Sequence, residues 1–296
     1  MLKRTLFFSN PCRLSVKDKQ MLIQLTDTGE IKTVPVEDMG FVVLEHQQIS
    51  ISLPLLDELV KNNVAVVFCN NTYHPASMLL NLNGHHLQQE LFSNQIEASV
   101  PLKKNLWKQT VEAKINNQAG LLKVLGKDFK KVAYFATNVK TGDAENREGS
   151  AARAYWPELF GASFIRERYG DPPNNMLNYA YAVLRAAVAR ALTGSGLLAT
   201  LGIHHHNRYN AFCLADDIME PYRPFVDSLV YELWYTLHEI NELTTEIKMK
   251  LVGVLTADVK IGGQIRPLMV ALSNTTASLS RCYTGETKKI VYPKIY

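Results

Sequence analysis

A cluster of histidines followed closely by carboxylates is the part of this sequence best able to do chemistry. His204, His205 and His206 stand in a row, and acidic residues follow at Asp217 and Glu220. Asp217 and Glu220 are three positions apart, so on a helix they share one face and can converge on one ion. Imidazole and carboxylate together suit manganese or magnesium, and also zinc. The residue types and their spacing therefore predict a divalent-metal site.

The same residues allow a second interpretation. Three histidines in a row are also typical of a solvated or hydrogen-bonded turn. The acidic residues could be an exposed face of a helix that ends at Pro221 and Pro224. Short patterns are weak support for a metal site when they stand alone. Features elsewhere in the chain must decide between a metal site and a turn.

Two further blocks precede this run, which makes four blocks in one order. They read Glu148-Gly-Ser-Ala-Ala-Arg-Ala-Tyr-Trp156, Asp171-Pro-Pro-Asn-Asn-Met-Leu-Asn-Tyr-Ala-Tyr181, Gly202-Ile-His-His205 and Asp217-Ile-Met-Glu-Pro-Tyr-Arg-Pro224. In these blocks the sequence resembles the CRISPR-associated adaptation integrases, the spacer-acquiring endonucleases of bacterial and archaeal immune systems. The match covers the second half of the chain, and the shared order makes chance similarity a poor explanation.

The resemblance implies which residues hold the metal. In the family the ligands are a glutamate of the first block, the histidine of Gly-x-x-His and the acidic residue before Arg-Pro. Here these residues are Glu148, His205 and Glu220. His205 is chosen because Gly202 aligns with the family's glycine, and a neighbouring histidine would shift that register by one. Asp217 matches a second acidic position, as a secondary ligand or as a partner of a ligand. The implied cofactor is Mg²⁺ or Mn²⁺.

The resemblance also implies an activity and partners. Family members are metal-dependent endonucleases and integrases. They join the 3′-hydroxyl ends of captured foreign DNA, the prespacer, into the CRISPR repeat array by transesterification, which is spacer acquisition in antiviral defence. They form homodimers, and a dimer of a small CRISPR-associated partner bridges two of these on double-stranded DNA. The stretch Ile265-Arg-Pro-Leu268 and the overall length resemble type II members, which adds further type II adaptation proteins as partners.

Several other matched positions have a structural explanation that is as good as a chemical one. Tyr155, Asn178, Tyr179 and Arg223 match family positions, yet packing and helix contacts account for them equally well. Glu148 by itself could be an acidic residue stabilised by the positive end of a helix. Only the resemblance favours a metal ligand there.

A lysine-rich stretch indicates nucleic acid more clearly than the net charge of +4 does. Residues 99–140 contain nine lysines against only Glu112 and Asp128, an excess of seven positive charges. Lysines bind phosphates as point charges, which predicts salt-sensitive and sequence-tolerant DNA binding. A solvated helix face is the alternative. The proposed DNA contacts are Lys103, Lys104, Lys130, Lys131, Arg153, Arg166, Arg168, Arg208 and Arg266.

Composition restricts the class of protein. With 296 residues and 47% hydrophobic content, the chain can bury a large core. Its four cysteines are far apart and form no Cys-x-x-Cys pair, which argues against a disulfide framework and a zinc ribbon. No stretch approaches the roughly 18 apolar residues of a membrane span, and the N-terminus lacks a signal-peptide pattern. We expect a cytoplasmic protein.

The pattern of apolar residues along the chain changes between residues 90 and 100. Apolar β-branched runs at 5–8, 21–25, 31–36, 41–44 and 64–68 alternate with turn signals and predict strands, with one helix at 54–61. Helical periodicity follows at 107–125, 176–192 and 228–255. We therefore expect an α+β protein with a β domain at 1–95 and a mainly helical domain at 96–296. The resemblance implies that the first makes the dimer contact and the second is the catalytic and DNA-binding domain.

Two other patterns point away from chemistry. Gly194-Ser-Gly196 follows a helix rather than a strand and lacks Gly-Lys-Ser/Thr, so it predicts a helix C-cap and not a phosphate loop. Neither Ser150 nor Ser195 sits in Gly-x-Ser-x-Gly, which gives little support to a serine hydrolase. A small-phosphoester hydrolase and a non-catalytic DNA scaffold remain the alternatives to an integrase.

Overall fold

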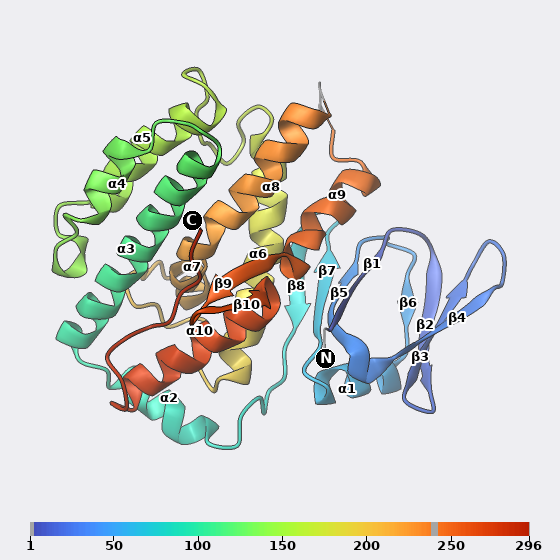
Figure 1. Ribbon diagram of the computed structural model, residues 1–296. Helices are drawn as coiled ribbons and strands as arrows, with labels where there is room; N and C mark the ends of the chain where they lie inside the picture. The colour runs from blue at the N-terminus through green and yellow to red at the C-terminus, as the bar shows by residue number, and fades with distance from the viewer. Residues whose placement is uncertain (1–2, 238–241, 296) are drawn as a thin grey trace.

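The computed structural model describes residues 3–237 and 242–295. Two small sheets lie at the N-terminal end, and a larger group of helices carries the rest of the chain (Figure 1). The α+β fold class, with strands first and helices after, is confirmed. All five expected strand runs are strands, and four cysteines are free.

The first sheet is buried on both faces. Its strands, in spatial order, are β1 (Arg4–Phe8), β5 (Met39–Leu44), β7 (Ala65–Cys69) and β8 (Pro75–Leu79). Phe41 and Val43 of β5 pack into the helical core, whereas Val42 and Leu44 pack toward the second sheet. Because alternate residues of a strand face opposite sides, burying both sides requires an unbroken apolar run.

The second sheet and one helix cover the outer face of the first. Its strands, in spatial order, are β4 (Ile31–Pro35), β3 (Gln20–Leu25), β2 (Cys12–Lys17) and β6 (Ser50–Ile51). Helix α1 (Leu53–Lys61) buries Leu55 and Leu59, which share a face at a spacing of four, against Leu14 and Val66. The N-terminal region therefore has a small core of its own.

The larger region is built around one buried helix. Its helices are α2 (Gln88–Ile96), α3 (Val100–Val124), α4 (Lys130–Ala136), α5 (Arg147–Phe160), α6 (Asn174–Gly194), α7 (Cys213–Met219), α8 (Arg223–Thr236), α9 (Thr245–Val252) and α10 (Leu268–Tyr283). Helix α6 contacts α7, α8, α9 and α10, and it is apolar around most of its circumference (Figure 1). Such a helix is typical of the centre of a core.

The helical periodicity over residues 228–255 does not correspond to one continuous helix. Helix α8 ends at Thr236, and residues 238–241 lie outside the described part of the chain. Helix α9 then begins anew, because the Thr244 hydroxyl accepts a hydrogen bond from the backbone N–H of Ile247. Apolar spacing continues through this region, but a threonine N-cap starts a new helix.

Two further elements differ from the sequence prediction. Helix α3 starts seven residues earlier than residue 107, where Ser99 accepts the backbone N–H of Leu102. A short hairpin, β9 (Asp258–Ile261) and β10 (Gln264–Pro267), turns at Gly262 and Gly263, both with positive φ. The alternation in these strands is too short to be recognised before folding.

The C-cap predicted after α6 is confirmed. The backbone N–H of Ser195 donates to the carbonyl oxygens of Ala191 and Leu192, and Gly196 has φ of +68°. This left-handed residue ends the helix, as expected for a glycine at that position. In the described part of the chain, no helix is both long and apolar enough to cross a bilayer.

A buried ion pair joins the two regions. The Lys248 ammonium of α9 lies 2.7 Å from Oε1 of Glu45, which follows β5, and both side chains are nearly inaccessible. Breaking such a pair leaves an uncompensated buried charge. The contact therefore ties the N-terminal sheet to the helical region that carries the predicted site.

Candidate metal centre and nucleic-acid cleft

Helix α3 brings a lysine to the two predicted glutamate ligands. The Nζ atom of Lys114 lies 2.6 Å from Oε1 of Glu148 and 2.6 Å from Oε2 of Glu220. Burial alone would lower the pKa of Lys114, but the charges of Glu220 and Glu148 outweigh burial and raise it. The structure thus makes the two carboxylates converge on one cation.

Glu148 is placed by the start of α5. The Asp143 carboxylate accepts the backbone N–H groups of Arg147 and Glu148, at 2.8 and 3.1 Å. The Asn146 side chain caps the same helix by accepting from the backbone N–H of Gly149. These contacts satisfy the free donors of the first turn and hold the Glu148 backbone.

Glu220 is held more tightly, because it is almost fully buried. It lies in the short helix η3 (Glu220–Tyr222), and its Oε1 atom is 2.9 Å from Arg223. Burial opposes ionisation, but Arg223 and Lys114 together keep the pKa of Glu220 below its usual range. Its Oε2 atom is close to Lys114 but has no donor in hydrogen-bonding geometry. Among the described residues, this buried carboxylate oxygen is therefore held by the charge of Lys114 and not by a hydrogen bond.

Asp217 organises the loop that carries His204, His205 and His206, here called the histidine loop. Its Oδ2 atom accepts the backbone N–H groups of Ile203 and His204, at 2.6 and 2.9 Å. Its Oδ1 atom accepts the N–H of His205 at 3.3 Å and lies 2.5 Å from the Nδ1 atom of that ring. With both oxygens engaged and the side chain fully buried, Asp217 is better placed to orient His205 than to bind a metal.

His205 keeps its other ring nitrogen unused by Asp217. The hydrogen bond to Asp217 raises the pKa of His205, and the charges of Glu220 and Glu148 act in the same direction. Those carboxylates are therefore within electrostatic reach of the ring. The bond at Nδ1 leaves Nε2 as the nitrogen that can ligate, which is the usual arrangement of a metal-binding histidine.

The histidine loop also packs against α3. The indole of Trp107 stacks on His204, with ring centroids 4.3 Å apart and an angle of 3°, and meets His205 edge-on at 5.7 Å. Gly202 must be glycine here, because a Cβ atom would lie 2.3 Å from the carbonyl oxygen of His205. The stack occupies a face of His204, which leaves His205 as the better oriented imidazole.

These groups fit a divalent ion in donor type. Within residues 3–237 and 242–295, no three His, Cys, Asp or Glu side chains already surround a common point. Instead, Glu148 and Glu220 surround the Lys114 ammonium, while Asp217 orients His205. Two carboxylates that converge on one positive charge and a carboxylate-bound imidazole match the ligand chemistry of Mg²⁺ or Mn²⁺. That Glu148, His205 and Glu220 hold a metal stays a prediction.

A cleft of about 750 Å³ opens beside His205. Lys103 and Lys104 of α3 line it, together with Trp107, the histidine loop and Arg208. Arg208 stacks over the exposed ring of Tyr209. Positive side chains and aromatic faces are the combination that single nucleic-acid strands bind.

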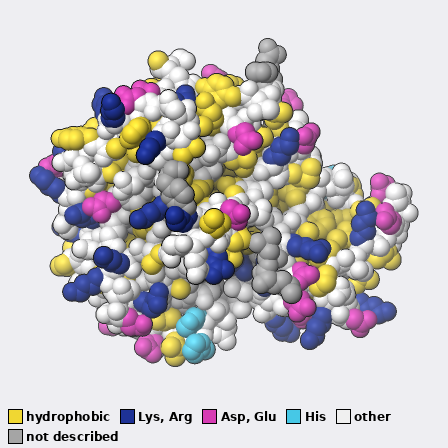
Figure 2. Space-filling model, viewed as in Figure 1, with side chains coloured by type: hydrophobic (Ala, Val, Ile, Leu, Met, Phe, Trp, Pro, Cys, Tyr) yellow, Lys and Arg dark blue, Asp and Glu magenta, His cyan; other side chains and the backbone are white. Residues whose placement is uncertain are grey.

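The other predicted DNA contacts are spread more widely. Lys130 and Lys131 are exposed on α4, and Arg153 is exposed on α5. Figure 2 shows Lys and Arg side chains over the helical part of this face, with acidic side chains among them. Charge is therefore distributed along the surface rather than gathered in one patch.

Three predicted arginine contacts have different surroundings. Arg166 is half-buried and donates to Asn174 and Asn178, which favours a structural role for it. Arg168 lies over the exposed ring of Tyr169. Arg266 lies on β10, outside the elements that line the cleft, and bonds to Gln264. The structure groups Lys103, Lys104 and Arg208, but does not place Arg266 with them.

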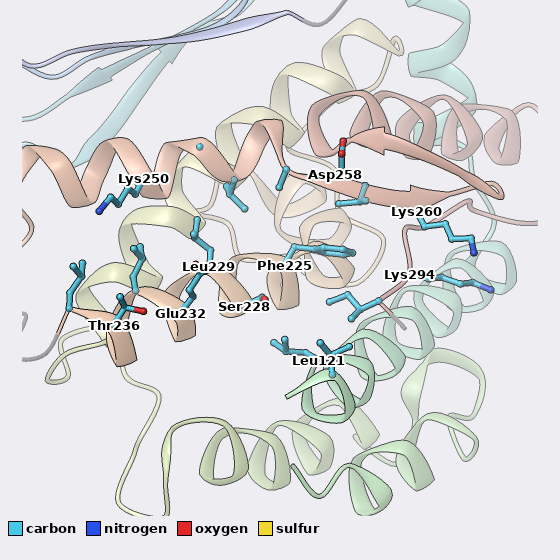
Figure 3. A pocket seen from close by; sticks show the side chains of 18 residues that line it. Leu121, Phe225, Ser228, Leu229, Glu232, Thr236, Lys250, Asp258, Lys260 and Lys294 are labelled. Carbon is cyan, nitrogen blue, oxygen red and sulfur yellow. The ribbon is translucent and has the colours of Figure 1, made fainter. Parts of the chain in front are cut away.

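A second hollow, of about 760 Å³, differs from the cleft beside His205 because its lining is mainly apolar. It lies between α8, the short helix η4 (Gly253–Thr256) and β9, with Phe225 and Leu229 facing it (Figure 3). Lys250 lies at one end, and Lys260 and Lys294 at the other. Its lining is mainly apolar and includes none of the predicted ligands.

Sequence reasoning missed Lys114 and Trp107 as parts of the site. Both lie on one face of α3, seven positions apart, in line with the buried residues Val111 and Gln118. A lysine within an otherwise buried stripe is a signal for a buried acidic partner, because an unpaired buried ammonium is costly. The lysine count concealed that signal, since it treated all nine residues as surface charge.

A buried carboxylate, Asp227, is expected to make stability depend on pH. The hydroxyls of Tyr155 and Tyr181 donate to Asp227. Burial raises the pKa of Asp227 to about 6, against the opposing effects of the two tyrosines and Arg223. A folded-state pKa above the unfolded value gives stability that is present below about pH 4 and is lost as the pH rises through about 6.

Asp227→Asn is expected to remove this dependence. The difference in unfolding free energy between wild type and variant should fall by up to about 3 kcal/mol between about pH 4 and about pH 7, at 1.36 kcal/mol per pKa unit. Urea unfolding of both proteins across that range measures it. A difference that stays constant with pH would show that Asp227 does not titrate there.

Comparisons with known proteins agree on one family. The family model described as CRISPR associated protein Cas1 matches residues 6–250. The CRISPR-associated endonuclease Cas1 of Neisseria meningitidis serogroup C (strain 8013) is 37% identical over 298 residues, covering 100% of this chain and 97% of that protein.

Solved structures share the fold at lower identity. A casposase bound to integration product superposes with a TM-score of 0.81 at 21% identity, over 98% of this chain and 92% of that one. A chain of a Cas6-RT-Cas1–Cas2 complex superposes with a TM-score of 0.73 at 19% identity, over 97% of this chain and 35% of that one. The likeness extends over both the sheets and the helices.

Proposed function

Because the chain belongs to the CRISPR-associated Cas1 family, we propose that it is a metal-dependent DNA integrase and endonuclease of CRISPR adaptation. It joins the 3′-hydroxyl ends of captured foreign DNA into the CRISPR repeat array. One observation carries the proposal: Glu148 and Glu220 converge on a single cation, near an oriented His205 at the edge of a basic cleft.

The reaction is a transesterification. The oxygen of a DNA 3′-hydroxyl bonds to phosphorus in the repeat, the bond from phosphorus to the repeat's own 3′-oxygen breaks, and the hydroxyl proton passes to solvent. The number of phosphodiester bonds is unchanged. Hydrolysis uses water in place of the 3′-hydroxyl, which accounts for endonuclease activity at the same site.

The residues of the site have two roles, as metal ligands and as groups that position those ligands. Glu148, Glu220 and His205 would hold Mg²⁺ or Mn²⁺, which supplies charge stabilisation at phosphorus. Asp217 orients His205, and Arg223 keeps Glu220 ionised in its buried position. A group held in place before the reaction loses little free energy to reorganisation during it.

The basic side chains at the cleft are assigned to the DNA backbone. Lys103, Lys104 and Arg208 line the cleft beside the histidine loop, within reach of a strand that enters it. Exposed lysines on α4 extend the positive surface away from the cleft. Such contacts position DNA without reading its sequence.

Assembly follows from the geometry of the reaction. The described residues of one chain carry one such site, whereas inserting a spacer requires joining at both ends of a repeat, so two or more subunits act together. We assign residues 1–95 to the homodimer contact and residues 96–296 to catalysis and DNA binding. The related Cas6-RT-Cas1–Cas2 complex supports Cas2 as the partner, to which we assign the bridge between two dimers, and the casposase bound to integration product supports integration of DNA.

A joining assay tests the function. The protein, Cas2 and Mn²⁺ are mixed with labelled duplexes that end in a 3′-hydroxyl or a 3′-dideoxy group, and with a supercoiled plasmid that carries CRISPR repeats. Label should join the plasmid only from the 3′-hydroxyl duplex. Equal plasmid nicking with both duplexes would indicate a hydrolytic nuclease, and tight DNA binding without reaction would favour a non-catalytic scaffold.

Salt dependence tests the DNA surface. Replacing Lys103, Lys104, Lys130 and Lys131 with glutamine should weaken duplex binding and reduce the slope of log K against log salt by up to roughly 3–4, at about 0.9 per phosphate contact. Fluorescence anisotropy at several salt concentrations measures the slope.

A matched control removes the same number of exposed lysines from the N-terminal region. These are Lys17, Lys19, Lys32 and Lys61. We expect the control to keep the wild-type slope. If both variants keep it, the lysines of α3 and α4 are ordinary solvated surface.

A further inference from the structure

We propose that Lys114 is a built-in cation of the metal centre. It holds Glu148 and Glu220 together before the metal binds, and it leaves them for the DNA phosphate when the metal arrives. This inference rests on the proposed function, because it assigns Lys114 to the same site. It adds a positioning residue that neither the sequence motifs nor the ligand chemistry includes.

Position is the first argument. Lys114 Nζ contacts Oε1 of Glu148 and Oε2 of Glu220 at the same distance, 2.6 Å, so it lies between the two predicted ligands. Its side chain is only 12% exposed. A cation that binds the same two oxygens must occupy nearly the same place, so Lys114 and a metal ion cannot both stay there.

Charge is the second argument. Two carboxylates, Glu148 and Glu220, face two cations, Lys114 and Arg223, so the four side chains sum to zero without a metal. A divalent ion would leave these four side chains with two excess positive charges, of which the buried Asp217 carboxylate beside His205 offsets one, and repulsion is strong in a largely buried site. A DNA phosphodiester beside the ion then attracts the displaced ammonium. The lysine and the metal are thus exchangeable partners of the same carboxylates.

Flexibility is the third argument, and it separates Lys114 from Arg223. A lysine has four rotatable bonds and a compact ammonium, so Nζ can move several ångströms while α3 stays in place. Arg223 contacts Oε1 of Glu220, whereas the Oε2 atom next to Lys114 has no donor in hydrogen-bonding geometry. The contact of Lys114 with Glu220 is therefore electrostatic, its hydrogen bond to Oε1 of Glu148 is the one exchanged for a DNA phosphate, and Arg223 can stay on Glu220 throughout.

Mn²⁺ binding tests the exchange without relying on activity. Lys114→Met keeps the length of the side chain and removes the competing charge. We expect it to bind Mn²⁺ roughly 10-fold more tightly than wild type in calorimetric titration, because no ammonium has to be displaced and one positive charge fewer repels the ion. Without metal, the variant should melt at least roughly 2–4 °C below wild type. Adding Mn²⁺ should raise the melting temperature of the variant by more degrees than it raises that of wild type.

Lys114→Arg tests the proposal with the opposite sign and keeps the buried charge. A guanidinium can bind both carboxylates in a fork and is harder to displace, so Mn²⁺ affinity should fall below that of wild type. This variant decides the question even where Lys114→Met does not fold without metal. Lys108→Met is the matched control, because Lys108 of α3 pairs with Glu112 at the surface, and it should bind Mn²⁺ as wild type does.

The outcomes separate this inference from the proposed function. If wild type, Lys114→Met and Lys114→Arg all bind Mn²⁺ equally well, Lys114 is only a member of an ordinary buried ion pair. The inference is then overturned. If Mn²⁺ binds neither wild type nor any variant, the proposal of a metal centre, and with it the proposed function, is wrong. Tighter Mn²⁺ binding in Lys114→Met together with weaker strand transfer supports both the exchange and the phosphate role.

Discussion

Glu148→Ala, His205→Ala and Glu220→Ala are each expected to lower strand transfer by at least about 100-fold, the effect of removing one group that stabilises transition-state charge. DNA binding should change little, because lysines and arginines, rather than the three predicted ligands, hold the phosphates. Joining of labelled 3′-hydroxyl DNA to a repeat plasmid measures the first effect, and anisotropy measures the second.

Glu220 needs a gentler variant beside alanine. Its side chain is only 6% exposed and pairs with Arg223 and Lys114, so its removal leaves buried cations unpaired. Glu220→Gln keeps the shape and removes the charge. Glu232→Ala, an exposed carboxylate on α8, is the control and should transfer strands as wild type does. Any of the three predicted ligands whose variant folds and stays fully active does not belong to the site.

Asp217→Asn is expected to lower strand transfer by roughly 10–100-fold, as altered partners of metal-bound histidines do. The amide replaces an accepting oxygen with a donor that faces backbone N–H groups of residues 203–205. Each buried donor left without a partner costs about 1–3 kcal/mol. Because the amide keeps one accepting oxygen, either the N–H groups of residues 203 and 204 or the N–H and Nδ1 of His205 lose their acceptor, so Mn²⁺ affinity and melting temperature should fall together.

The neighbouring Asp216 gives a closely matched control. Its carboxylate pairs with Arg185 and Asn210 rather than with the histidine loop. Asp216→Asn should therefore retain Mn²⁺ affinity even if it melts slightly earlier. Equal losses of Mn²⁺ affinity in the two variants would mean that Asp217 acts through general stability and not by orienting His205.

Much of the fold followed from local patterns. The apolar runs at 41–44 and 64–68 indicated the strands β5 and β7, and the Gly194-Ser-Gly196 turn indicated a helix end. The break before α9 depended on one capping threonine within a continuing apolar pattern. Periodicity reports which residues are buried, but not where a helix is interrupted.

For the site, the sequence by itself determined the candidate ligands, because residue types and motif order do not depend on folding. The tertiary structure decided which side chains meet. Lys114 and Glu148 are 34 positions apart, and packing of α3 against α5 and η3 brings both glutamates to one ammonium. Asp217 and His205 lie 12 positions apart on either side of a loop, so a carboxylate that resembled a ligand in the sequence orients the histidine in the fold. Motif spacing is a property of neighbouring residues, whereas these contacts depend on how helices pack.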